Sequence, residues 1–242
     1  MEEVKKIFEK LGIPCGPEKI EKLSDYMEEI LELNKHINLT AITDRRDFIR
    51  KHYVDSLLCA GLDEFKDSRL IIDVGTGGGF PGVPLAIAFP NKQFILIDSL
   101  NKRIKIINEL CGKLSIDNVT AIHGRAEELA RRKDMRESFD LCISRAVANM
   151  STLSEYCLPF VKVGGAFIAY KGPGYEQELE TAANAIKILG GEVSGEKSPE
   201  VSDILGSSDI PFDHKLIVIN KIENTVSKFP RKAGTPSKEP IK

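Results

Sequence analysis

The sequence lacks a long apolar run and an organised cysteine pattern. Its apolar stretch near the middle, residues 83–89, is far shorter than the roughly 18 residues that a membrane-spanning helix needs. The five cysteines are an odd number without CxxC spacing, which disfavours disulfides and a zinc site. We therefore expect no membrane segment, no metal, and cysteines that are small buried hydrophobes.

The chain also lacks a strong net charge and an apolar leader. It has 34 Lys and Arg against 36 Asp and Glu, so bulk electrostatics does not indicate a nucleic-acid binder. The first residues, MEEVKK, are charged rather than apolar, from which we expect a cytoplasmic protein. Residues 224–242 differ, because they hold five basic residues, one acid and three prolines. We expect this segment to be an extended basic arm without a helix.

Hydrophobic periodicity divides the chain into three parts. Residues 1–62 show apolar positions at helical spacing and predict an N-terminal helical extension, with a third helix over about 45–60. Residues 63–223 alternate short apolar runs with helical stretches, which is typical of strand-helix-strand units. The sequence therefore predicts an α/β protein with a doubly wound, mostly parallel sheet, followed by the basic arm at 224–242. Strands are expected near 70–74, 94–97, 119–122, 139–143, 166–170 and 216–220, with a weaker one near 192–194.

The most informative segment is a buried strand that runs into a glycine-rich turn, LIIDVGTGGGFPG at 70–82. Glycines permit positive φ angles and allow a ligand to approach the backbone. The turn resembles that of S-adenosylmethionine-dependent methyltransferases, because Asp73 ends the strand and the pattern continues as D-x-G-x-G-x-G. We treat Asp73 as scaffold and expect Gly75, Thr76, Gly77 and Gly79 to contact the cofactor.

Polar residues follow the neighbouring strands of the predicted sheet. Asp98 ends the second strand, where a carboxylate can bind ribose hydroxyls, although it can also cap the next helix. The third strand leads to Ala126 and Glu127, which could frame an adenine ring. Arg145 ends the fourth strand, at the edge where ligands of such sheets bind, and can pair with a carboxylate or a phosphate.

Along almost its whole length the chain resembles the RsmG, or glucose-inhibited division protein B, family of small-subunit rRNA guanine-N7 methyltransferases. The matching segments are residues 38–40, 52–57, 73–87, 98–99 with 102–103, 125–127, 144–148 and 230–238. The resemblance implies a Rossmann-like class I methyltransferase fold and the cofactor S-adenosyl-L-methionine. It also implies that the cofactor is held at Gly75, Phe80, Ala126, Glu127 and Arg145.

The resemblance implies methylation of N7 of a guanosine, position 527, in 16S rRNA of the small ribosomal subunit. Guanine N7 has an in-plane lone pair and needs no general base, so we expect no catalytic acid or base, only proximity and electrostatic support. Lys171, Arg231, Lys232 and Lys238 are candidate contacts to RNA phosphates. His52 and Asp55, three residues apart on one helix face, are expected to brace the loop near Asn38 or to contact RNA. His36, His123 and His214 are interpreted as ordinary polar residues.

Other functions stay open from the residues alone. The same cofactor motif suits a methyltransferase acting on another RNA or on a small molecule. Gly77, Gly79 and Gly82 also fit the G-x-G-x-x-G pattern of an NAD-dependent dehydrogenase. A third reading is a non-catalytic RNA-binding module. Nothing in the sequence requires a partner copy, so we expect a monomer.

Overall fold

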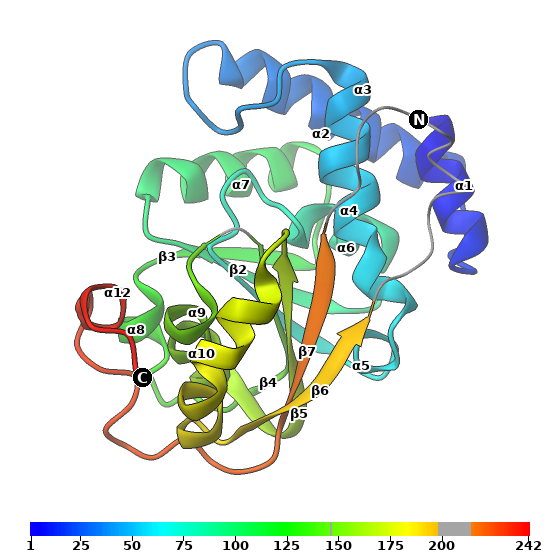
Figure 1. Ribbon diagram of the computed structural model, residues 1–242. Helices are drawn as coiled ribbons and strands as arrows, with labels where there is room; N and C mark the ends of the chain where they lie inside the picture. Colours follow the sequence, from blue (N-terminus) through cyan, green and yellow to red (C-terminus); the bar gives the residue numbers. More distant parts are fainter. Residues whose placement is uncertain (146, 198–213) are drawn as a thin grey trace.

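The computed structural model describes residues 1–145, 147–197 and 214–242 (Figure 1). Its centre is a seven-stranded sheet with the strand order β3-β2-β1-β4-β5-β7-β6. The strands are β1 (Leu70–Val74), β2 (Gln93–Asp98), β3 (Val119–His123), β4 (Phe139–Arg145), β5 (Val161–Lys171), β6 (Gly191–Lys197) and β7 (Lys215–Lys221). β1 to β5 are parallel, whereas β7 is antiparallel to both β5 and β6. This confirms the predicted doubly wound, mostly parallel sheet.

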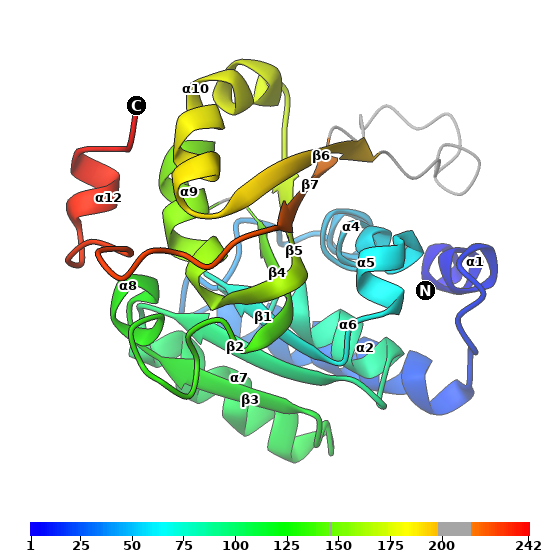
Figure 2. The ribbon, with the colours of Figure 1, turned by 90° about the horizontal axis from the view of Figure 1, so that it is seen from below.

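Helices cover both faces of the sheet, and Figure 2 shows α9 and α10 on the side opposite α2, α6 and α7. The longer helices are α1 (Glu2–Lys10), α2 (Pro17–Asn34), α6 (Gly82–Ala88), α7 (Asn101–Lys113), α9 (Met150–Cys157) and α10 (Tyr175–Ile188). A short helix α5 (Asp63–Lys66) follows the N-terminal extension, and another, α8 (Ala126–Leu129), follows β3. Every predicted strand overlaps an observed one, although β5 begins five residues earlier than expected, at Val161.

Alternate residues of β1 belong to two different hydrophobic cores. Ile71 is in the core shared with α1, α2, α6 and α7, whereas Ile72 is in the core shared with α9 and α10. The N-terminal helices bury apolar side chains at helical spacing, including Phe8 and Tyr26, in the first of these cores. The helical extension therefore packs directly on the sheet, against the same core residues that support the glycine turn.

The predicted third helix, over 45–60, is broken into four segments. They are α3 (Arg45–Phe48), a π-helical segment η1 (Ile49–Val54), α4 (Asp55–Leu57) and a 3-10 segment η2 (Leu58–Gly61). A π turn contains more residues than an α turn and changes the direction in which the following side chains point. Such segments are common at functional sites, and this one carries His52 and is followed directly by Asp55.

The C-terminal segment differs from the expected helix-free arm. Thr235–Lys238 forms a one-turn helix, α12, in which Pro236 occupies the first turn, where its missing N–H group is not needed. Phe229 and Pro236 are buried, and the segment lies beside α8 and α9 in both views. The expectation was wrong because composition alone does not reveal which surface an apolar or proline residue can pack on.

Candidate functional site

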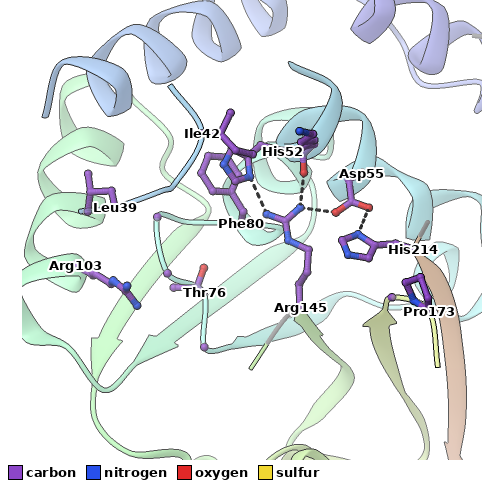
Figure 3. Close-up of a pocket in the computed structure, with 15 residues that line it drawn as sticks. Leu39, Ile42, His52, Asp55, Thr76, Phe80, Arg103, Arg145, Pro173 and His214 are labelled. Atoms are coloured by element: carbon purple, nitrogen blue, oxygen red, sulfur yellow. Dashed lines mark hydrogen bonds and ion pairs between the residues drawn. The ribbon is translucent and has the colours of Figure 1, made fainter. Parts of the chain in front are cut away.

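A pocket of about 600 Å³ opens at the carboxyl ends of β1 and β4, beneath the N-terminal helices (Figure 3). It is bounded by the glycine turn, by η1 and by the residue that precedes β7. Its lining residues are Leu39, Ile42, Lys51, His52, Asp55, Gly75, Thr76, Gly77, Gly78, Phe80, Arg103, Arg145, Gly172, Pro173 and His214. The carboxyl edge of a parallel sheet is where ligands of open α/β folds bind.

Asp73 holds the glycine turn in shape. Its Oδ2 atom accepts hydrogen bonds from Thr76 Oγ1 at 2.7 Å and from Gly82 N at 2.9 Å. The side chain is fully buried, and burial raises its pKa to about 6. The scaffold role expected for Asp73 is confirmed, because both of these bonds stay within the turn.

The glycines of the turn serve different purposes. Gly75, Gly77 and Gly79 all have positive φ angles, of 75°, 60° and 89°. A Cβ atom at Gly79 would lie 2.4 Å from Tyr26 Oη, and one at Gly75 would lie 2.4 Å from Val147 Cγ2, so both positions are limited by packing. A Cβ atom at Gly77 would meet nothing within 4 Å, because this residue faces the pocket. Gly77 is therefore the place where a ligand can come closest to the backbone.

Asp98 joins the second strand to the turn. Its carboxylate, 5% exposed, accepts hydrogen bonds from Gly77 N at 3.0 Å and Leu100 N at 2.8 Å, and Arg103 Nη1 lies 3.4 Å away. The side chain makes no capping bond to α7, so the helix-cap alternative is wrong. The ribose contact stays a prediction.

Arg145 is the centre of the polar side of the pocket (Figure 3). Its Nη1 atom donates to Asp55 Oδ2 at 2.5 Å and to the Lys51 carbonyl at 3.0 Å, and its Nη2 atom lies 3.0 Å from His52 Nδ1. His214 Nδ1 lies 2.8 Å from the other carboxylate oxygen of Asp55. Burial would raise the pKa of Asp55, but Arg145 and His214 outweigh it and hold the pKa below its usual value.

His52 forms an aromatic wall with Phe80. The two rings are stacked, with centroids 4.2 Å apart and an interplanar angle of 9°, and the Arg145 guanidinium lies 5.8 Å from the Phe80 centroid. Burial and the charge of Arg145 lower the pKa of His52 to about 3, so the ring is neutral at pH 7. His52 Nε2 is 2.8 Å from Thr40 Oγ1, which fits the expected bracing of the loop near Asn38.

Five of the nine predicted cofactor residues line the pocket, namely Gly75, Thr76, Gly77, Phe80 and Arg145. Gly79 and Asp98 support the turn from behind. Ala126 and Glu127 lie at the start of α8, after β3, and do not line this pocket. The Glu127 side chain is 4% exposed and accepts a hydrogen bond from Gly234 N at 2.8 Å.

The predicted RNA-binding residues fall into two groups. Lys171 Nζ donates to the Ala148 carbonyl at 3.0 Å and pairs with Glu178, and Arg231 pairs with Glu155. Lys232 and Lys238 are exposed on the C-terminal segment. Lys171 and Arg231 are thus already paired with carboxylates of the protein itself, whereas Lys232 and Lys238 face solvent.

The sequence reasoning missed the site role of His214 and left that of Asp55 open. Both belong to the network around Arg145, although 159 residues separate them. No sequence pattern links two such residues. The pairing of β7 with β5 places His214 at this edge, and a hydrogen bond from Tyr170 of β5 to the Ser56 carbonyl holds the segment of Asp55 beside it. Ala146, within the matched segment 144–148, lies outside the described residues.

The part of the chain that the structure describes holds neither a membrane-spanning helix nor a cluster of metal-ligating side chains. None of its helices is long and apolar enough to cross a membrane. Within the same residues, no three His, Cys, Asp or Glu side chains gather as metal ligands would.

Comparison with solved structures identifies the fold. The chain is similar to an O-methyltransferase from Bacillus cereus, solved in complex with SAH, at 16% identity and a TM-score of 0.56, covering 89% of this chain and 96% of the other. A putative O-methyltransferase from Klebsiella pneumoniae gives 14% identity and a TM-score of 0.55, covering 90% and 96%. The fold is therefore the Rossmann-like class I methyltransferase fold.

Comparison with sequences identifies the family. The family described as rRNA small subunit methyltransferase G matches residues 19–201. Proteins named ribosomal RNA small subunit methyltransferase G are 45% identical in Clostridium perfringens (strain SM101 / Type A), over 99% of this chain and 98% of the relative, and 49% identical in Alkaliphilus oremlandii (strain OhILAs), over 96% and 95%. With the glycine turn and the Arg145 pocket in place, the chain belongs to the rRNA small subunit methyltransferase G family.

Proposed function

We propose that this protein transfers a methyl group from S-adenosyl-L-methionine to N7 of a guanosine, position 527, in 16S rRNA of the small ribosomal subunit. The observation that carries the proposal is the open backbone at Gly77 facing the Arg145 network across one pocket. The names of the relatives support the rRNA substrate, and the SAH in the Bacillus cereus neighbour supports the cofactor.

The residues of the pocket fit such a cofactor. Gly77 leaves room for a ligand against the backbone, and Phe80 supplies an apolar wall. Arg103 and Arg145 are cations that would pair with an amino-acid carboxylate. Asp98, which lies behind the turn and not in the pocket lining, is the proposed acceptor for ribose hydroxyls. When bound, the cofactor supplies a methyl group activated by a positively charged sulfur.

The hydrogen-bond partners and protonation of His52 and Asp55 agree with direct attack by the N7 lone pair on the methyl group. Both ring nitrogens of His52 already have partners, and its pKa of about 3 makes it a poor proton acceptor at pH 7. The carboxylate of Asp55 is held by Arg145 and His214. A reaction that removes no proton from its substrate before attack, such as N7 methylation, suits this pocket.

The proposal assigns orientation and charge support to the chain's own residues. The π-helical segment holds His52 against Phe80, and the Asp55–Arg145 pair fixes the guanidinium at the pocket. Lys232 and Lys238, exposed on the C-terminal segment, are proposed contacts to RNA phosphates. We further propose that the enzyme acts as a cytoplasmic monomer.

The test is a transfer assay with methyl-labelled S-adenosylmethionine. Small subunits, naked 16S rRNA and tRNA, all from cells lacking the enzyme, are offered in parallel, and the label is mapped by cleavage at N7-methylguanosine. We expect label at one guanosine of the small-subunit RNA.

Variants connect that activity to the pocket. Arg145→Ala and Arg145→Lys should both lower the rate by about 100-fold, because a lysine cannot keep the paired contacts of a guanidinium. Arg132→Ala, which removes an exposed arginine paired with Asp134, is the matched control and should retain activity. Label on tRNA alone, or binding of NAD in place of S-adenosylmethionine, would contradict the proposal. Cofactor binding without turnover on any RNA would instead indicate a non-catalytic RNA-binding module or a small-molecule acceptor.

A further inference from the structure

The C-terminal segment 229–241 runs across α8 and α9 at one side of the sheet (Figures 1 and 2). It is attached by side chains of both helices. Thr152 Oγ1 donates to the Pro236 carbonyl at 2.9 Å, and Ser151 Oγ donates to the Ile241 carbonyl at 2.6 Å. Both bonds come from α9 and end on the backbone of the segment, so they fix its path.

Arg231 makes the strongest of these attachments. Its backbone N lies 2.6 Å from Glu155 Oε1, its Nε 3.1 Å from the same oxygen, and its Nη2 2.7 Å from Oε2. The Glu155 side chain is only 1% exposed, so its charge depends on Arg231 for compensation. Arg231 is therefore turned toward the protein interior.

Two further bonds join the segment to α8 and to Arg131, two residues after its end. Glu127 Oε1 accepts a hydrogen bond from Gly234 N at 2.8 Å, and Arg131 Nη2 donates to the Pro230 carbonyl at 2.5 Å. α8 is a helix of four residues, Ala126–Leu129, so these two bonds hold it near its beginning and just beyond its end. Gly234 has a φ of 83°, the left-handed conformation that turns its N–H group toward Glu127.

We propose that segment 229–241 is a strap that positions the Ala126–Glu127 corner for cofactor binding, with Arg231, Glu155 and the Glu127 carboxylate as positioning residues. This inference rests on the proposed function and on the family resemblance, which implies that Ala126 and Glu127 hold the cofactor. The corner lies at the carboxyl end of β3, outside the lining of the pocket described above. A helix of one turn has little stability of its own. Its place at the end of β3 then depends on the chain that crosses it.

The strap has two faces with different tasks. Arg231 points toward Glu155, whereas Lys232 and Lys238 are exposed. Loss of an inner contact should therefore weaken cofactor binding, and loss of an outer lysine should weaken RNA binding. The two effects can be separated by measuring the affinity for S-adenosylmethionine and the KM for small ribosomal subunits on the same variants.

The experiment measures the Kd for S-adenosylmethionine by calorimetry and the KM for small ribosomal subunits, on the full chain. Arg231→Ala removes the side-chain bonds to both Glu155 oxygens, and Glu127→Ala removes the bond from Gly234 N. Each should raise the cofactor Kd by about tenfold and leave the KM for subunits within about twofold. Glu127→Gln should restore affinity, because its amide oxygen still accepts from Gly234 N. The Lys232→Ala/Lys238→Ala double variant should show the opposite pattern.

A double variant separates the strap from direct contact. If Glu127 and Arg231 act through one strap, Glu127→Ala with Arg231→Ala should raise the Kd little more than either change alone. Additive effects would mean that the Glu127 carboxylate touches the cofactor by itself and would overturn the strap. Melting curves accompany each variant, and Arg231→Lys, which keeps the charge, replaces Arg231→Ala if the latter unfolds.

The remaining outcomes are also decisive. An unchanged cofactor Kd with a raised KM for subunits in Arg231→Ala would make Arg231 an RNA contact and overturn the strap, while the proposed function would stand. Failure of the unaltered protein to bind S-adenosylmethionine would defeat the proposed function and the strap with it.

Discussion

His52 shows how the surroundings of one residue change its chemistry. An exposed histidine titrates near pH 6.5, but burial and Arg145 lower the pKa of His52 to about 3. Its two nitrogens hold Thr40 and Arg145, and its ring lies flat on Phe80. A single neutral imidazole thus connects the loop near Asn38 to the pocket wall.

This shift predicts a pH dependence of stability. Between about pH 3 and 6.5 the unfolded chain binds a proton at His52 that the folded chain does not, so His52 makes the folded state less stable as the pH falls. The contribution is at most about 1.4 kcal/mol per pH unit in this window. We expect the free energy of unfolding, measured with urea, to fall between pH 7 and pH 4.5 by less in His52→Gln than in the unaltered protein. The raised pKa of Asp73 makes the folded state more stable as the pH falls, which is the opposite effect. It is the same in His52→Gln and in the unaltered protein, so it cancels when the two pH profiles are compared. Parallel pH profiles would contradict the assignment.

A second prediction at this scale concerns the glycine turn. Gly77→Ala should weaken cofactor binding by about tenfold or more, because its methyl group enters the pocket, and should cost about 1 to 2 kcal/mol of stability through its positive φ. Gly79→Ala should cost about 2 to 5 kcal/mol, because its Cβ would also overlap Tyr26 and Val83. Calorimetry and urea unfolding on both variants measure the two effects. Equal destabilisation by the two changes would contradict the different roles given to these glycines.

At the scale of elements, β7 holds the ends of two helical segments through one buried lysine. Lys221 Nζ donates to the Leu158 carbonyl at 3.0 Å and to the Leu189 carbonyl at 3.1 Å, next to the ends of α9 and α10. The side chain is fully buried, and burial lowers its pKa to about 8. The buried amine shares these two carbonyls with other donors, Val161 N and Thr225 Oγ1, and connects β7 to both segments.

Replacement of this lysine tests the connection. Lys221→Met should lower the free energy of unfolding by about 2 to 3 kcal/mol, because it removes the bonds to both carbonyls and leaves Glu137, 3.3 Å away, without its cation. Lys162→Met is the matched control. Lys162 pairs with Asp140 but is half exposed, so its loss should cost less than about 1 kcal/mol. Urea unfolding measures both, and a larger loss in Lys162→Met would contradict the role of Lys221.

At the scale of the whole molecule, charge is placed unevenly. The chain is close to neutral overall, yet the C-terminal segment carries exposed Lys232 and Lys238 on the outside of the proposed strap. Contacts to phosphates release bound counterions, so binding weakens as the salt concentration rises. The neutral total is therefore no obstacle to a local RNA contact.

The salt dependence of RNA binding measures this contact. In Lys232→Ala/Lys238→Ala the slope of log K against log salt should fall in magnitude by about 1.4 to 1.8, the share of two phosphates. Lys5→Ala/Lys66→Ala removes two exposed lysines that pair with Glu2 and Asp63, and it should leave the slope unchanged. An unchanged slope in the first variant would remove these lysines from the RNA interface.

Much of the fold and part of the site could be predicted from local patterns. Short apolar runs placed the strands, and the glycine turn with Asp73 marked one wall of the pocket. The network around Arg145 could not be predicted as a whole, because Asp55 and His214 meet only through the packing of α4 and β7 in the folded protein. Similarly, the composition of the C-terminal segment predicted its charge but not the attachment of Arg231 to Glu155.

The sequence by itself determined the strand and helix periods, the glycine turn and the likeness to its family, because these depend on neighbours a few residues apart. Only the tertiary structure decided which charges point inward. Whether Arg145 or Arg231 is paired depends on buried carboxylates, Asp55 and Glu155, that lie 90 and 76 residues away along the chain. The physical reason is that a buried carboxylate needs a partner within hydrogen-bonding distance, and folding alone determines which residue comes that close.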